Sequence, residues 1–147
     1  MITVLLVDDH ASILKSLQYL LEATDDIQVL ATASNGIEAV AWASSHCPDI
    51  TVMDISMPVM DGMEATRQIC QCCPLTRVMM LSMFDGPEYI QRALQVGALG
   101  YVLKDTVSDD LLIAVRVLSM GHQYFSPKIA TVAEAFVKQK GKDSWVG

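Results

Sequence analysis

Five short apolar runs alternate with five helix-like segments along this 147-residue chain, and this alternation constrains the fold more than any other feature. Each run has the length and apolar character of a buried strand. The runs are residues 3–7, 27–33, 50–54, 77–81 and 101–103. The predicted helices between and after them are residues 13–21, 37–46, 63–72, 87–96 and 108–118. Such alternation predicts a parallel sheet with right-handed crossovers and helices on both faces.

By analogy with flavodoxin-like folds, we expect an α/β, doubly wound (βα)5 sandwich whose five-stranded parallel sheet has the order 2-1-3-4-5. Ligands bind such sheets outside the carboxyl ends of the strands, where the strand order reverses. Ser126-Pro127 predicts the start of a sixth helix that runs to about Lys140, because proline favours the first helical turn. Its apolar side could pack on this domain, on another domain or on a second copy. We expect residues 140–147 to form a linker or a frayed end.

Composition excludes several classes of protein. A net charge of −7 argues against a nucleic-acid surface within the chain, whose nearest basic cluster is Lys138, Lys140 and Lys142. No apolar run approaches the ~18 residues of a transmembrane helix, and the first residues lack the basic start of a signal peptide. The four cysteines lack paired metal-binding spacing, so we expect reduced thiols rather than a disulfide or a zinc site.

Polar residues stand at the ends of four of the five predicted strands. They are Asp8 and Asp9 after the first strand, Asp54 at the end of the third, Ser82 after the fourth and Lys104 after the fifth. Each alone has an ordinary explanation, as a helix cap, a turn hydroxyl or a solvated charge. The carboxyl ends of parallel strands meet at one edge, so we expect all of these side chains to share one crevice.

The chemistry of this set is coherent. Three carboxylates that lie together repel one another, and a hard divalent cation is the usual compensation. Mg²⁺ is typically held by one or two carboxylates together with phosphate oxygens, and Mn²⁺ could replace it. An aspartate can act as a nucleophile and form an acyl phosphate. Lys104 would then provide a positive charge near the phosphoryl oxygens, and Ser82 a hydroxyl donor.

Four segments resemble the receiver domain of two-component response regulators. They are Val7-Asp8-Asp9-His10, Met53-Asp54-Ile55-Ser56-Met57-Pro58-Val59-Met60-Asp61-Gly62, Leu81-Ser82 and Gly97-Ala98-Leu99-Gly100-Tyr101-Val102-Leu103-Lys104-Asp105. The resemblance covers residues 2–120, and together with residues 121–127 it is similar to the NarL/LuxR-type subfamily. One departure is Asp105, since many receivers have proline directly after the lysine.

The resemblance implies a role for each residue at this edge. Asp54 is expected to be the phosphoacceptor. Asp9, Asp54 and the backbone carbonyl of Ser56 are expected to bind Mg²⁺ directly, and Asp8 through a water molecule. Lys104 and Ser82 are expected to contact the phosphoryl group. Ser82 and Tyr101 are the expected switch residues, with Tyr101 turning between an exposed and a buried position, although it could also be an ordinary edge-strand aromatic.

The resemblance also implies a biological role. A sensor histidine kinase would phosphorylate a cytoplasmic receiver domain (residues 1–120), and activation would favour a homodimer. Residues 121–147 would link it to a helix-turn-helix output domain that binds DNA. That output domain is absent here, because of truncation or because this regulator lacks it. A receiver domain of this kind is a signalling switch, not an enzyme with a separate substrate, and it has no membrane partner.

Three other classes of protein fit the sequence less well. An aspartyl-phosphate hydrolase or phosphatase needs a second acid two residues after the nucleophile, where this chain has Ser56. A receiver that works without phosphate as a binding module usually lacks an acid or the lysine, and both are present here. A flavin- or nucleotide-binding domain would need a Gly-x-Gly-x-x-Gly segment after a strand, which this chain lacks.

Overall fold

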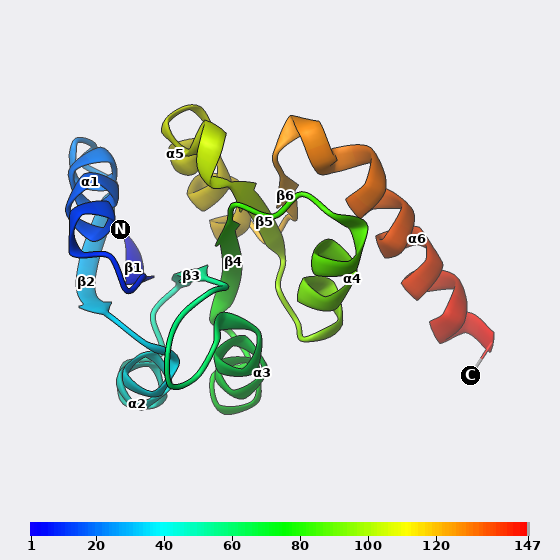
Figure 1. The fold of residues 1–147 in the computed structure, drawn as a ribbon, viewed down its shortest axis with the longest axis horizontal. Helices are drawn as coiled ribbons and strands as arrows, with labels where there is room; N and C mark the ends of the chain where they lie inside the picture. Colours follow the sequence, from blue (N-terminus) through cyan, green and yellow to red (C-terminus); the bar gives the residue numbers. More distant parts are fainter. Residues whose placement is uncertain (147) are drawn as a thin grey trace.

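The computed structural model describes the backbone of residues 1–146 and the side chains of residues 1–140. Its centre is a six-stranded parallel sheet with the order β2-β1-β3-β4-β5-β6 (Figure 1). The strands are β1 (Ile2–Val7), β2 (Ile27–Ala33), β3 (Ile50–Asp54), β4 (Arg77–Ser82), β5 (Gly100–Leu103) and β6 (Tyr124–Phe125). The helices are α1 (Ala11–Glu22), α2 (Gly36–His46), α3 (Gly62–Cys72), α4 (Pro87–Gln95), α5 (Val107–Ser119) and α6 (Ala130–Val146), with short 3-10 turns η1 (Lys104–Thr106) and η2 (Pro127–Ile129).

The predicted order of the first five strands is confirmed. The sixth strand was not predicted: β6 has only two residues and pairs in parallel with Gly100 and Tyr101 of β5. A two-residue strand is too short to show an alternating apolar pattern, so sequence periodicity could not indicate it.

Side chains that alternate along each strand supply two separate cores. Leu5 and Val7 of β1 point to the face covered by α2, α3, α4 and α6. Val4 and Leu6 point to the opposite face, which α1 and α5 cover. Because both faces are covered, the inner strands carry almost continuous apolar runs, as parallel sheets do. None of the helices described here has both the length and the apolar character needed to cross a bilayer.

Residues 121–146, which we call the C-terminal arm, fold back onto the domain. α6 lies beside α4 (Figure 1), and Ile129 and Ala133 are buried against the core. Of the three packing partners left open by the sequence, the structure therefore shows the domain itself. The predicted end of this helix at Lys140 is wrong, because α6 continues to Val146, whereas Gly147 lies outside the described residues.

A buried carboxylate fixes the start of the arm. Asp110 of α5 accepts hydrogen bonds from Ser126 Oγ (2.8 Å), Tyr124 Oη (2.8 Å) and Thr106 Oγ1 (2.7 Å). Burial alone would raise the pKa of Asp110, but these three hydroxyl donors outweigh it and lower the pKa. Ser126 Oγ also accepts a hydrogen bond from the Leu103 amide (3.0 Å), which joins the arm to β5.

The expectation of four reduced thiols is wrong for one pair. Cys47 and Cys73 form a disulfide in the structure, whereas Cys70 and Cys72 are free. The two bonded residues are 26 positions apart in the sequence and follow the ends of α2 and α3. Sequence spacing gave no indication of this pair, because the packing of α2 beside α3 brings the two residues together.

Candidate functional site

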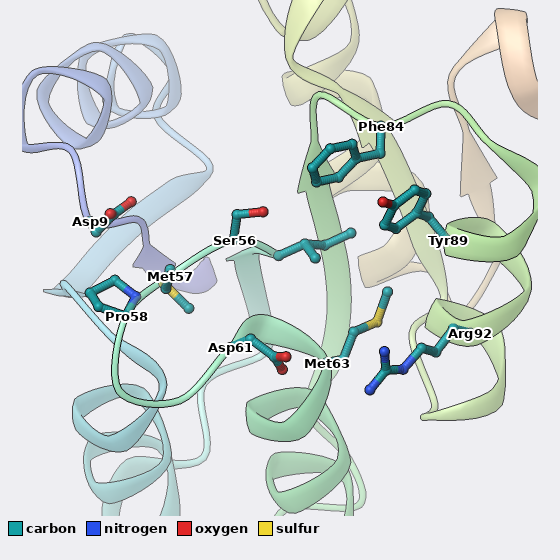
Figure 2. A pocket seen from close by; sticks show the side chains of 10 residues that line it. Asp9, Ser56, Met57, Pro58, Asp61, Met63, Phe84, Tyr89 and Arg92 are labelled. Atoms are coloured by element: carbon teal, nitrogen blue, oxygen red, sulfur yellow. The ribbon is translucent and has the colours of Figure 1, made fainter.

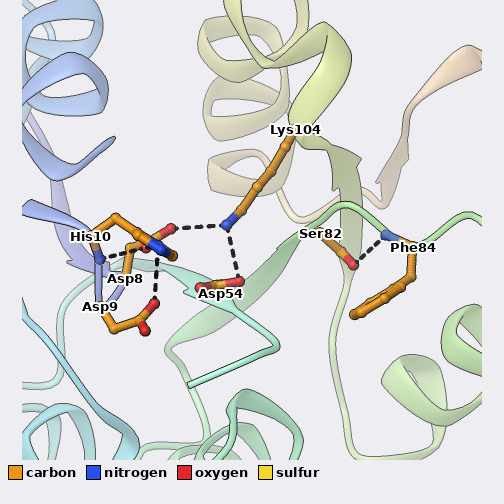
Figure 3. A network of polar contacts seen from close by, with 7 residues as sticks. All are labelled: Asp8, Asp9, His10, Asp54, Ser82, Phe84 and Lys104. Atoms are coloured by element: carbon orange, nitrogen blue, oxygen red, sulfur yellow. Dashed lines mark hydrogen bonds and ion pairs between the residues drawn. The ribbon is translucent and has the colours of Figure 1, made fainter. Parts of the chain in front are cut away.

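The polar residues predicted to share a crevice do lie together at the carboxyl ends of β1, β3, β4 and β5 (Figure 3). Val7 is aligned with Met53, and Asp54 with Leu81, so Asp8 and Asp54 leave neighbouring strands at almost the same level. The start of α3 fixes the loop after Asp54. Asp61 caps this helix by accepting a hydrogen bond from the Glu64 amide (2.9 Å), and Gly62 packs so closely that a methyl group there would collide with the Asp54 carbonyl oxygen.

Lys104 joins two buried carboxylates. Its Nζ lies 3.2 Å from Asp8 Oδ2 and 3.3 Å from Asp54 Oδ1 (Figure 3). The side chains of Asp8 and Asp54 are 0% and 4% exposed, so water screens these charges only weakly. One cation is therefore shared by two carboxylates at the centre of the site.

This arrangement leaves the carboxylate of Asp54 only partly compensated. Burial, and next the negative charge of Asp8, raise the pKa of Asp54, and Lys104 only partly opposes this shift. Burial would lower the pKa of Lys104, but the charges of Asp54 and Asp8 outweigh it and raise that pKa. Lys104 is thus firmly held in its charged form, whereas Asp54 lacks a positive partner of its own.

The unfilled hydrogen-bonding capacity of the site fits a divalent cation. Asp8, Asp9, His10 and Asp54 each place one ligand atom so that all four atoms lie within 4.8 Å of one another. Asp54 Oδ2 is buried without a hydrogen-bond partner, and Asp8 Oδ2 has the Lys104 ion pair but no well-directed hydrogen bond. Buried carboxylate oxygens are costly when left unpaired, and oxygen-rich sets of this kind suit Mg²⁺.

His10 belongs to this cluster, although no role was predicted for it. Its Nδ1 lies 3.0 Å from Asp8 Oδ1 and 3.1 Å from Asp9 Oδ1, and its backbone amide donates to Asp8 Oδ1 (2.9 Å). The position of His10 directly after the acid pair was visible in the sequence. Sequence alone could not show that the imidazole folds back over both carboxylates.

Ser82 and Tyr101 are both connected to one residue of the β4–α4 loop. Ser82 Oγ accepts a hydrogen bond from the Phe84 amide (2.9 Å), and Tyr101 Oη donates to the Phe84 carbonyl (2.7 Å). Tyr101 is 1% exposed, so its ring occupies the buried position. Burial raises the pKa of Tyr101 to about 12, which keeps the phenol protonated and able to donate this bond.

Two hollows open beside the acidic cluster. One has a volume of about 390 Å³ and includes Asp54, Ser56, Ser82 and Lys104 in its lining. The other, of about 480 Å³, extends from Asp9 and Ser56 past Phe84 to Arg92 (Figure 2). The structure thus brings together all the predicted metal-binding and phosphoryl-contacting residues, and Asp54 faces a space that could admit a phosphoryl donor.

The comparison with protein families decides which family this site belongs to. The model of the response regulator receiver domain matches residues 4–116. The chain belongs to this family. The receiver is 36% identical over 143 residues to the oxygen regulatory protein NreC of Staphylococcus carnosus, covering 96% of this chain and 66% of that protein. It is 37% identical over 142 residues to NreC of Staphylococcus haemolyticus, covering 95% and 65%. The chain therefore spans just under two thirds of the length of these curated relatives.

Solved structures agree with this assignment. A two-component response regulator of the LuxR family from Aurantimonas sp. SI85-9A1 has a TM-score of 0.85 at 32% identity, over 90% of this chain and 95% of that one. The signal receiver domain of a response regulator described as NarL, from Mycobacterium tuberculosis, has a TM-score of 0.78 at 30% identity, over 82% and 98%. The receiver is thus of the NarL/LuxR type, as its motifs predicted. Asp105 follows Lys104 in this chain, and the described peptide bonds, including the one between these two residues, are all trans.

Proposed function

We propose that Asp54 accepts a phosphoryl group from a sensor histidine kinase in a Mg²⁺-dependent reaction. One observation carries this proposal. The Asp54 carboxylate faces a hollow with one oxygen held by Lys104 at 3.3 Å, while its other oxygen is buried without a partner. A carboxylate that is fixed in place but incompletely solvated is suited to nucleophilic attack on phosphorus.

The residues around Asp54 would bind the metal ion and contact the phosphoryl group. Asp9, Asp54 and the backbone carbonyl of Ser56 would hold Mg²⁺, with Asp8 acting through a water molecule; Mn²⁺ could substitute. When bound, the ion supplies positive charge that offsets the negative charge of the carboxylates and of the phosphoryl oxygens. Lys104, already between Asp8 and Asp54, would donate to a phosphoryl oxygen.

Ser82 and Tyr101 would pass the signal to the β4–α4 loop. To donate its hydroxyl proton to a phosphoryl oxygen, Ser82 would move toward Asp54 and give up the bond it accepts from the Phe84 amide. Phe84 is also the residue whose carbonyl holds Tyr101. Phosphorylation would therefore change the balance between two arrangements of this loop, because only one of them offers the new hydrogen bond.

Membership of the receiver family supports a wider role. We propose a cytoplasmic switch that forms a homodimer on activation and has no separate substrate. Residues 1–120 would receive the phosphoryl group. Residues 121–147 would connect them to a helix-turn-helix output domain outside this sequence. Contact with DNA, and hence control of transcription, would belong to that output domain.

The decisive test is incubation with Mg²⁺ and acetyl phosphate, followed by intact-mass measurement. We expect the mass of one phosphoryl group to appear on the wild type and to be absent when Mg²⁺ is chelated or when Asp54 is replaced by asparagine. Asp105→Asn provides a matched control, because it removes a neighbouring exposed carboxylate and should leave phosphorylation unchanged. A phosphoryl group that persists in Asp54→Asn would show that the acceptor is a different residue.

Self-association needs a separate measurement. Beryllofluoride mimics the phosphoryl group on an aspartate, so adding it with Mg²⁺ should shift the wild type toward a dimer in size-exclusion chromatography. The Asp54→Asn variant should stay unchanged under the same conditions. A wild-type protein that takes up one phosphoryl group but keeps its elution volume would retain the assignment of Asp54 and refute activation by dimerisation.

A further inference from the structure

The Cys47–Cys73 pair lies at the far end of the domain from the phosphorylation site. α3 begins at Gly62, in contact with Asp54, and its 11 residues carry the chain about 16 Å along the sheet before Cys73 is reached. α2 and α3 lie side by side (Figure 1), and Cys47 and Cys73 follow their last residues. This pair has no part in the proposed phosphoryl chemistry.

The backbone positions of Cys47 and Cys73 suit both the disulfide and the reduced pair of thiols. The Cα atoms are 5.6 Å apart, within the usual range for a disulfide. Ala43, in the last turn of α2, accepts a hydrogen bond from the Cys47 amide (2.7 Å). The same carbonyl oxygen lies 3.1 Å from Cys73 Sγ, so a reduced Cys73 thiol would have an acceptor in its present position. Neither form therefore requires the helices to separate.

The neighbouring cysteine residues differ strongly in their exposure to solvent. Cys47 is exposed, whereas Cys73 is 2% exposed. Cys72 is also exposed, and its Sγ lies 3.9 Å from Cys73 Sγ. Burial raises the pKa of the Cys70 thiol, which makes this residue a poor nucleophile. A reagent in solution would therefore react first with Cys47 or Cys72. Cys73 could react only with a sulfur atom that is already part of the protein.

We propose that Cys47 and Cys73 form a reversible thiol–disulfide site that exchanges with a low-molecular-weight disulfide. The Cys47 thiolate attacks one sulfur of that reagent, forming a mixed disulfide and releasing one thiolate. Cys73 then loses its proton and attacks the Cys47 sulfur, which closes the protein disulfide and releases the second thiolate. The protein loses two electrons and two protons, and the reagent becomes two thiols. The reverse sequence opens the bond, as is usual for disulfides in reducing compartments.

Cys72 provides an internal comparison for this mechanism. It is exposed, like Cys47, but its sulfur has no cysteine partner across the helix pair. Cys73 is the adjacent residue, with its Sγ 3.9 Å away, but Cα atoms of adjacent residues are only about 3.8 Å apart, which is below the usual range for a disulfide. A mixed disulfide formed at Cys72 should therefore persist. The two exposed cysteines are thus expected to give different products with the same reagent.

Glutathione buffers of graded ratio, followed by acid quenching, maleimide labelling and intact-mass measurement, test the proposal on the full chain. We expect two of the four thiols to be lost together between the reduced and oxidised ends, with peptide mapping that links Cys47 to Cys73. Cys72 should lose its label separately, as a third thiol, by gaining one glutathione. Cys47→Ser and Cys73→Ser should each abolish the linked peptide, whereas Cys72→Ser should retain it.

Three results on the wild type alone would overturn the proposal, whether or not any variant folds. Maleimide labels on both Cys47 and Cys73 at every ratio would show that the pair does not close. A link that survives excess reduced glutathione under native conditions would show a permanent disulfide. A link between Cys47 and Cys72 would show that the wrong thiol was assigned. Each readout concerns sulfur chemistry and is independent of the phosphorylation proposed for Asp54.

Discussion

Replacing Asp54 by asparagine should stabilise the protein when no metal is present. The Asp54 side chain is 4% exposed, and burial together with the charge of Asp8 raises its pKa. Asparagine has nearly the same size and shape but carries no charge. In this variant Lys104 would neutralise Asp8 alone, so the site would contain one ion pair in place of one cation shared by two anions.

The size of this stabilisation can be derived from the distances between the charged groups of the site. At an effective dielectric constant of about 20, the 3.3 Å contact between Asp54 and Lys104 corresponds to about 5 kcal/mol of attraction. The ligand oxygens of Asp8 and Asp54 lie within 4.8 Å, which gives a repulsion of at least about 3.5 kcal/mol. The small remaining attraction is outweighed by desolvation, which costs several kcal/mol per buried ion. We therefore expect Asp54→Asn to add on the order of 2 kcal/mol to the free energy of unfolding, or roughly 4–8 °C to the Tm.

Urea and thermal unfolding, each with chelator and with saturating Mg²⁺, would measure this effect. Mg²⁺ should stabilise the wild type by about 2.7 kcal/mol at a concentration 100 times its Kd, and should stabilise Asp54→Asn far less. Asp105→Asn, which removes an exposed carboxylate beside Lys104, should change the unfolding free energy by less than about 0.5 kcal/mol. If Asp54→Asn unfolds more easily than the wild type in chelator, or gains as much from Mg²⁺, then the proposed charge balance is wrong.

Three further predictions concern the surroundings of the site. Because the pKa of Asp54 is raised, its contribution to metal-free stability should fall as pH rises from about 3.8, the ordinary value, through the raised folded-state value, and chemical unfolding should show the stability advantage of Asp54→Asn over the wild type growing across this range. Gly62→Ala should cost about 1–3 kcal/mol of stability and slow phosphorylation by acetyl phosphate, because the added methyl group would meet the Asp54 backbone; in Gly86→Ala only the flexible Glu88 side chain is near, and an equal loss there would contradict this explanation. Ser126→Ala should cost about 1–3 kcal/mol in urea unfolding, because the buried Leu103 amide loses its acceptor, whereas Ser119→Ala on the α5 surface should cost much less.

The residues that could be predicted from sequence are those governed by local pattern or by the geometry of parallel strands. Asp8, Asp54 and Lys104 end apolar runs, and a parallel sheet brings such ends to one edge whatever the details of packing. Pairs that depend on how helices pack could not be predicted. Cys47 and Cys73 meet only because α2 and α3 are adjacent, and their separation of 26 residues carries no periodic signal.

In the C-terminal arm, too, features set by local sequence could be predicted and features set by packing could not. Pro127 indicated a helical start, yet the strand before it has two residues and no pattern to detect. The predicted end at Lys140 was based on the segment that follows it, where Gly141 and Asp143 are poor helix formers. Contacts between α6 and α4 are long-range, so local propensity could not reveal them.

Two buried aspartates in the same domain show how an external ligand site differs from a structural one. As whole residues, Asp110 and Asp54 are 5% and 3% exposed, yet their pKa values move in opposite directions. Asp110 has three hydroxyl donors from its own chain, which stabilise its charge and fix the arm. Asp54 shares one lysine with Asp8 and keeps an unpartnered oxygen. At Asp110 the chain itself supplies the partners that a buried carboxylate needs. The missing partner of the Asp54 carboxylate is therefore best explained by a ligand that comes from outside the chain.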